Sequence, residues 1–232
     1  MKEKHNCQHH CLGKKSCVSL VPIFNHLNSE QMAEIMASVK TFSFKKGESL
    51  YNAGDQSDSL YIVSHGKVRI YRLSESGKEQ LLRILEVGDF TGELALFKET
   101  IHESYAEAMV DTEICTIKRD SLHEILIKYP SISLKLLKEF SNRLEEAERQ
   151  TTSFSTERVE TRLASYLYEC IDEESDSKRI RLPMSKKDLA SYLGTTPETI
   201  SRKLYEMEDA GYIKQISNKE IEIINFKKIL SI

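Results

Sequence analysis

The segment MSKKDLASYLGTTPETISRKLYEMEDAGYI, residues 184–213, decides the fold of the C-terminal part of the chain. Ser185, with Asp188 three residues later, has the capping-box arrangement that begins a helix, and Gly194 ends that helix. A three-residue turn then leads into a second stretch with helical periodicity. Two helices joined by a tight turn with glycine form the helix-turn-helix unit, so the segment predicts one.

The second of these helices has two candidate caps. Thr195 with Glu198 would complete a capping box, whereas Thr196 would be followed by Pro197 at the first helical position. The helix is expected to stop at the Ala-Gly pair 210–211. The strand-like runs on either side of SNK, residues 217–219, predict a wing behind it.

The side chains of the second helix suit DNA, because its N-terminal turns enter the major groove in a helix-turn-helix. Glu198, Ser201 and Arg202 share one face. Arg can bond guanine, Glu can accept from cytosine, and Ser can meet several base edges. An ordinary surface helix with a Glu198–Arg202 pair, worth about 0.2–0.5 kcal/mol, is the alternative. The residues suited to phosphate contacts are Thr195, Thr196, Lys186, Lys187 and Lys203.

The middle of the chain predicts an antiparallel barrel or sandwich. Six of the nine glycines fall between Gly47 and Gly92, and short apolar runs such as SLYIVS, KVRIYRL and EQLLRIL lie between them. Short strands at regular intervals with turn signals are typical of such folds. The last run, EICTIK, contains Cys115.

After Pro130 the sequence predicts a long helix that pairs with a second copy. Its apolar residues are spaced 3, 3, 4 and 3 positions apart, close to the 3.5-residue period of a coiled coil. Glutamates at 145, 146 and 148 would repel their counterparts and keep a dimer switchable. A single amphipathic helix that covers the barrel is the alternative. The residues predicted to form the dimer interface are Leu134, Leu137, Phe140, Leu144 and Ala147.

The N-terminal stretch HNCQHHCLGKKSCVSL, residues 5–20, contains Cys7, Cys11 and Cys17 in a C-x3-C-x5-C spacing. The chain has no run of about 18 apolar residues and no apolar segment typical of a secretory signal, so we expect a cytoplasmic protein without a membrane span. In a reducing compartment, clustered cysteines indicate metal binding or redox chemistry. The net charge of −3 argues neither for nor against nucleic acid.

Three motifs carry a resemblance to the CRP/FNR family of regulators over nearly the full length: GELALF, HESYAEA and LPMSKKDLASYLGTTPETISRKL. The resemblance implies an α+β fold: an N-terminal double-stranded β-helix (a cyclic-nucleotide-binding-like jelly roll), a long dimerisation helix and a C-terminal winged helix-turn-helix. The domains expected are a Cys-rich sensor leader at 1–20, the barrel at 21–120, the dimerisation helix at 121–153 and the DNA-binding domain at 154–232.

Within the family, the nucleotide-binding branch has Arg-Ser or Arg-Thr where this chain has Glu103-Ser104, so cyclic AMP is not expected to bind. HESYAEAMVDTEICTI and ETISR resemble the oxygen-sensing branch instead. That resemblance implies TTGAT-type palindromes read by Glu198, Ser201 and Arg202. It also implies a 4Fe–4S cluster, whose ligands would be Cys7, Cys11, Cys17 and Cys115.

The resemblance further implies that the intact cluster packs the leader against the dimerisation helix and favours the dimer. The dimer would place two recognition helices about 34 Å apart on palindromic double-stranded DNA. Oxygen would dismantle the cluster and release the DNA. The loop Ser74 to Glu79 lies where relatives contact RNA polymerase, which makes polymerase a candidate partner.

Other readings of the cysteines stay open. Zinc could use them with His5, His9 and His10, and haem ligation by His or Cys is a further alternative. A disulfide between one leader cysteine and Cys115 would make a redox switch without a cluster. Cys170 is read as a buried small apolar residue.

A regulator whose barrel binds a small molecule is an alternative of another class. An enzyme is not expected, because Glu93 is a lone carboxylate with no paired acid or base at useful spacing.

Overall fold

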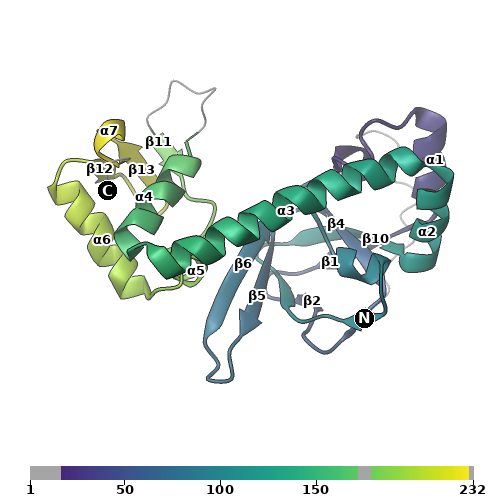
Figure 1. Ribbon diagram of the computed structural model, residues 1–232, viewed down its shortest axis with the longest axis horizontal. Coiled ribbons are helices and arrows are strands. Elements are labelled where there is room, and N and C mark those ends of the chain that lie inside the picture. The colour runs from purple at the N-terminus through teal and green to yellow at the C-terminus, as the bar shows by residue number, and fades with distance from the viewer. Residues whose placement is uncertain (1–16, 172–178, 230–232) are drawn as a thin grey trace. The chain divides into compact units, whose positions relative to one another are not determined.

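The computed structural model describes residues 17–171 and 179–229, which form two compact units (Figure 1). The first unit runs to Arg143 without residues 79–81, and the second contains residues 79–81 and those from Leu144 onward. In the described part, no helix combines the length and the apolar character needed to cross a bilayer.

The first unit is a sandwich of two four-stranded sheets, with orders β1-β10-β4-β7 and β2-β9-β5-β6, and a small β3-β8 pair. The register-defined pairings within it are antiparallel. Before the strands come η1 (Cys17–Leu20) and α1 (Ser29–Ala37), and η2 (Glu93–Leu96) follows β7. The strands are β1 (Val39–Phe44), β2 (Ser49–Tyr51), β3 (Gln56–Ser57), β4 (Ser59–His65), β5 (Val68–Leu73), β6 (Glu79–Leu85), β7 (Phe90–Thr91), β8 (Thr100–Ile101), β9 (Tyr105–Ala108) and β10 (Thr112–Lys118).

Strand β10 is buried on both faces and joins two cores. Ile114 points into the core between the two sheets, beside Val63 and Val68. Cys115 and Ile117 belong to the other core, which lies under the helices. Ile114 and Cys115 are neighbours in the chain and therefore point to opposite faces of the strand, and both are buried.

Two glycines of the barrel are required by close contacts. At Gly66, with φ of +89°, an added Cβ would lie 2.4 Å from the Thr112 hydroxyl oxygen. At Gly92, with φ of +83°, it would lie 2.3 Å from the Ser59 carbonyl oxygen. Both positions combine the left-handed conformation with a backbone approach that other residues would block.

Two helices follow the barrel, α2 (Arg119–Lys128) and α3 (Pro130–Thr156). The domain expected at 121–153 therefore contains two helices, and α3 extends three residues further. The break falls at Tyr129 because the residue before a proline is disfavoured in helical geometry. The N-cap of α1 is Asn28, whose side chain accepts from the Gln31 amide, while the Gln31 side chain accepts from the Asn28 N–H in return.

The second unit contains a winged helix-turn-helix. Its elements are α4 (Val159–Glu169), β11 (Arg179–Arg181), α5 (Lys186–Tyr192), α6 (Pro197–Asp209), β12 (Ile213–Gln215), β13 (Glu220–Ile223) and α7 (Phe226–Ile229). The three strands form an antiparallel sheet in the order β11-β13-β12. The fold class expected from the sequence is thus confirmed.

Candidate DNA interface and regulatory site

The helix-turn-helix is held by local caps. The Ser185 hydroxyl accepts from the Asp188 amide at 3.1 Å and begins α5. The cap of α6 is Thr196, whose Oγ1 accepts from the Thr199 amide at 3.3 Å, with Pro197 at the first position. The Thr195 amide instead closes the turn by donating to the Ala190 carbonyl at 2.8 Å. Of the two candidate caps, the structure uses the one followed by proline.

The α6 helix has one buried and one exposed face. Ile200, Leu204 and Met207 are fully buried. Glu198, Ser201 and Arg202, the predicted base readers, are exposed together on the opposite face. Arg202 makes its ion pair with Glu206, at 3.8 Å, and not with Glu198. The predicted reading face is therefore presented as a unit.

The lysines predicted to contact phosphate differ in their surroundings. Lys203 is mostly buried, and its Nζ lies 2.6 Å from Glu206 and 3.1 Å from Glu160. Hydrogen bonds to these carboxylates raise the pKa of Lys203. Lys203 therefore ties α6 to α4, and its role at phosphate stays a prediction. Lys186 bonds Gln215 Oε1 at 2.9 Å, whereas Lys187 is exposed.

Cys115 lies at the centre of the core under the helices. It is 2% exposed and shares that core with Val18, Val21 and Phe24, which lie shortly after Cys17 in the chain. Its Sγ lies 3.8 Å from Thr41 Oγ1. Cys115 is disulfide-bonded, whereas Cys170 is free. The strand thus holds the predicted fourth ligand against the segment that leaves the leader.

The predicted metal site cannot be read from the described side chains. Cys7, Cys11 and the histidines at 5, 9 and 10 lie outside the described residues, and of Cys17 only the backbone is described. Among the side chains that are described, no group of three His, Cys, Asp or Glu could hold a metal. The ligand set stays a prediction.

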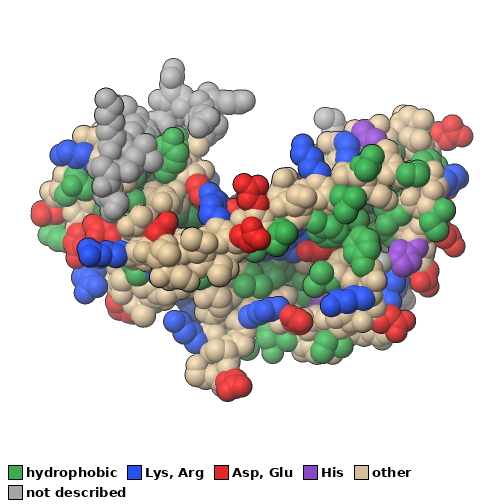
Figure 2. Space-filling model, viewed as in Figure 1, with side chains coloured by type: hydrophobic (Ala, Val, Ile, Leu, Met, Phe, Trp, Pro, Cys, Tyr) green, Lys and Arg blue, Asp and Glu red, His purple; other side chains and the backbone are tan. Residues whose placement is uncertain are grey.

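The α3 helix exposes most of the apolar residues predicted to pair. Leu134, Leu137 and Leu144 are 70%, 59% and 61% exposed, and Ala147 is exposed as well. Phe140 is partly buried, with its ring 5.6 Å from that of Phe97. Figure 2 shows exposed hydrophobic side chains gathered over the barrel unit on the side where α3 crosses it. An apolar helix face of this kind is typical of a self-pairing surface.

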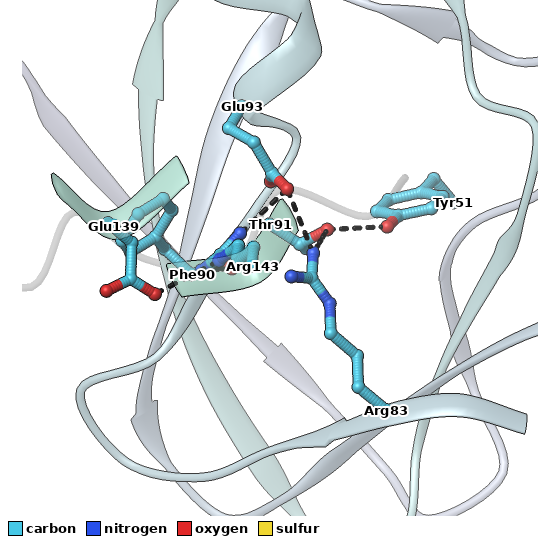
Figure 3. Close-up of polar contacts among 7 residues, drawn as sticks. All are labelled: Tyr51, Arg83, Phe90, Thr91, Glu93, Glu139 and Arg143. Carbon is cyan, nitrogen blue, oxygen red and sulfur yellow. Dashed lines mark hydrogen bonds and ion pairs between the residues drawn. The ribbon is translucent and has the colours of Figure 1, made fainter. Parts of the chain in front are cut away.

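Glu93 is the centre of a buried ion-pair network (Figure 3). Its Oε1 lies 2.7 Å from Arg143 Nη1 on α3 and 3.1 Å from Arg83 Nη2 on β6. Burial opposes ionisation, but the two arginines hold the pKa of Glu93 below its usual value. Arg143 also bonds the Phe90 carbonyl at 3.1 Å and Glu139 at 3.0 Å.

Sequence reasoning missed this network and treated Glu93 as a lone carboxylate. Its partner Arg143 lies fifty residues away along the chain. The prediction for that helix used only the spacing of its apolar residues, so it gave Arg143 no role. One local signal was available: Arg143 lies four positions after Glu139, the spacing of an ion pair on one helix face.

Glu103 does not point into the barrel. Its side chain is 66% exposed and pairs with Arg72. The interior beside Glu93 contains instead Tyr51, which bonds Thr91 Oγ1 at 2.9 Å (Figure 3) and stacks on His102 with centroids 3.6 Å apart. The expectation that cyclic AMP does not bind stays a prediction.

A jelly-roll barrel, a helix with an exposed apolar face and a winged helix-turn-helix define a DNA-binding regulator with a sensor domain. Residues 41–129 match the cyclic nucleotide-binding domain, and residues 161–232 match the Crp-like helix-turn-helix domain. The chain belongs to the CRP/FNR family of transcription regulators, whose members bind DNA, act as dimers and are not enzymes.

Relatives are similar over most of their length. The probable transcriptional regulator flp of Lacticaseibacillus casei is 36% identical over 90% of this chain and 94% of its own. The fumarate and nitrate reduction regulatory protein of Vibrio cholerae is 28% identical over 97% of this chain and 91% of its own. The structure of FixK2 from Bradyrhizobium japonicum matches with a TM-score of 0.72 and 28% identity, covering 83% of this chain and 96% of that one.

Proposed function

We propose that this regulator senses oxygen or redox state through Cys115 and the leader cysteines, and that the signal controls its binding to palindromic DNA in the cytoplasm. The observation that carries the proposal is the position of Cys115. A buried cysteine on a central strand, packed in the same core as Val18 and Val21, supports sulfur chemistry shared with the leader cysteines.

In the first form of the proposal, the sulfur atoms hold a 4Fe–4S cluster. Four thiolates are the ligand set that such clusters take, and Cys7, Cys11, Cys17 and Cys115 supply them. The buried, apolar surroundings of Cys115 fit a cluster ligand, because they limit access of water to the sulfur. The cluster would supply an oxygen-labile link between the leader and the barrel.

In the second form, Cys115 and one leader cysteine make a thiol–disulfide switch without a cluster. A specific observation favours this candidate: Cys115 is disulfide-bonded in the structure. Such a switch needs two thiols and an oxidant that accepts two electrons and two protons. Both forms of the proposal use Cys115 on β10. In both, the signal would therefore pass from Cys115 to the rest of the protein by the same path.

That path runs through the core under the helices. Cys115 shares this core with Ile132 and Leu136, which are the buried residues of α3. The opposite face of α3 carries the exposed Leu134 and Leu137. A change in packing around Cys115 therefore acts on the inner face of the helix whose outer face is proposed to pair.

The DNA-reading part of the proposal rests on the exposed face of α6. Glu198, Ser201 and Arg202 are proposed to read TTGAT-type half-sites, with Arg202 at guanine. Two such helices in a dimer would meet successive turns of a palindrome. A contact of Ser74 to Glu79 with RNA polymerase belongs to the same proposal.

The test begins with protein purified without oxygen. The cluster form expects about four iron and four sulfide per chain, visible charge-transfer absorption and loss of both in air. The disulfide form expects neither, and instead a mass loss of two hydrogen atoms on oxidation, mapped by proteolysis to Cys115. Zinc, or oxygen-independent binding of a TTGAT palindrome, would overturn both forms.

A matched pair of variants separates sensing from folding. We expect Cys115→Ser to abolish the response of DNA binding to air in either form. Cys170→Ser is the control, because Cys170 caps the end of α4 and burial raises the pKa of its thiol, which keeps it unreactive. An oxygen response that survives Cys115→Ser would contradict the proposal.

A further inference from the structure

The recognition helix exposes one large side chain to which the base-reading face gives no role. Tyr205 is 66% exposed, whereas Ile200, Leu204 and Met207 of the same helix are fully buried. Among the described residues it has no hydrogen-bond partner. A solvent-exposed tyrosine at this position is available to a partner that would contact both its ring and its hydroxyl.

Tyr205 lies on the same face as the predicted base readers. At about 100° per residue, its position seven residues after Glu198 returns it to the direction of Glu198. In projection it falls between Ser201 and Arg202. It lies about 10 Å further along the helix axis than Glu198, so it reaches the region where the helix leaves the floor of the groove.

The groups around Tyr205 are acidic or already engaged. Glu206 pairs with Lys203 and Arg202. Glu208 accepts both the amide and the side chain of Gln215, at 2.8 and 3.0 Å. The nearby Lys203 is already paired with Glu160 and Glu206. The Tyr205 hydroxyl is therefore a neutral hydrogen-bond donor in this part of the helix.

We propose that Tyr205 donates its hydroxyl to a backbone phosphate at the edge of the groove and so sets the register of the base readers. Tyrosine is among the side chains that make such contacts, and they carry no sequence information directly. A neutral contact releases no counterion, unlike a lysine contact, so it leaves the salt dependence unchanged. The inference rests on α6 as the DNA-reading helix, not on the cysteine chemistry.

The test compares Tyr205→Phe with the wild type on a duplex that the wild-type protein itself selects from a random pool. Selection makes the test independent of the TTGAT assignment. Both proteins are measured in the redox state in which the wild type binds, by fluorescence anisotropy at several salt concentrations. Tyr168→Phe, at an exposed tyrosine of the same unit outside α6, is the matched control.

We expect Tyr205→Phe to weaken binding about tenfold for each subunit, and so about a hundredfold for a dimer on a palindrome, as for a lost hydrogen bond to a charged group. The loss should be equal on the selected duplex and on duplexes with single changed base pairs, with an unchanged salt slope and an unchanged melting temperature. Wild-type affinity in Tyr205→Phe would overturn the proposal. So would a loss confined to one base pair, which indicates base reading, or an equal loss in Tyr168→Phe.

Discussion

Arg143→Met is the substitution that most directly tests how the barrel holds α3. The guanidinium of Arg143 contacts Glu93 at 2.7 Å, Glu139 at 3.0 Å and the Phe90 carbonyl at 3.1 Å, and it lies over the Phe90 ring at 4.3 Å. Methionine keeps most of the apolar stem of the side chain but removes every one of these polar contacts. The substitution leaves Glu93, only 13% exposed, with Arg83 as its remaining ion-pair partner.

The magnitude follows from the burial of the pair. Removing one partner from a buried ion pair costs about 3–5 kcal/mol, because the other charge is left without compensation. Arg83 still lies 3.1 Å from Glu93, and Arg143 is itself 21% exposed. We therefore expect a smaller loss, about 2–3 kcal/mol of the free energy of unfolding.

Urea unfolding followed by circular dichroism measures this loss. Glu93→Gln should cost less in the Arg143→Met background than in the wild type, because the contact between Glu93 and Arg143 is already gone. Arg149→Met, on the same helix but with a 57% exposed side chain, should cost only about 0.2–1 kcal/mol. The reasoning is refuted if Arg143→Met costs no more than Arg149→Met, or if Glu93→Gln costs as much in the Arg143→Met background as in the wild type.

The same pair predicts a pH dependence. The pKa of Glu93 is lower in the folded protein than its ordinary value, because the two arginines outweigh burial. Its contribution to stability is therefore present above the unfolded pKa and is lost as the pH falls through the folded pKa. The stability difference between wild type and Glu93→Gln should shrink over this acidic range, as urea titrations at successive pH values would show.

The remaining predictions concern the dimer face, the barrel turn, the recognition helix and the loop. Leu137→Lys should shift the protein toward monomer in analytical ultracentrifugation, because it places a charge in an apolar seam. Gly92→Ala should destabilise the barrel by at least about 1 kcal/mol, since a Cβ would lie 2.3 Å from the Ser59 carbonyl oxygen. Thr196→Ala should cost about 1 kcal/mol in thermal unfolding through loss of the α6 cap. Shortening the loop 74–79 should leave DNA affinity intact and lower transcription in vitro.

Local features of the fold were predictable because their causes are local. The Ser185 cap, the proline after Thr196 and the glycine at 194 act within one turn of chain, so the helix-turn-helix could be predicted from a short segment. The choice between Thr195 and Thr196 was not predictable in the same way. Thr195 uses its amide to close the turn onto Ala190, and that geometry exists once both helices are in place.

Long-range contacts had no comparable signal. Three ion pairs join residues that are far apart along the chain: Glu93 with Arg143, Lys203 with Glu160, and the exposed Glu103 with Arg72. An ion pair on the surface contributes little free energy, and many such pairs are possible. A sequence pattern alone therefore does not specify which acidic residue contacts which basic residue.

By itself, the sequence determined the two domains, the recognition helix and the apolar seam of α3, because periodicity and capping act within a few residues. It also supplied the cysteines, but not their surroundings. The tertiary structure decided that Cys115 is buried beside the residues that follow the leader and beside the inner face of α3. Burial is a property of packed elements, and β10 becomes a two-sided core strand only when helices cover one face and the second sheet covers the other.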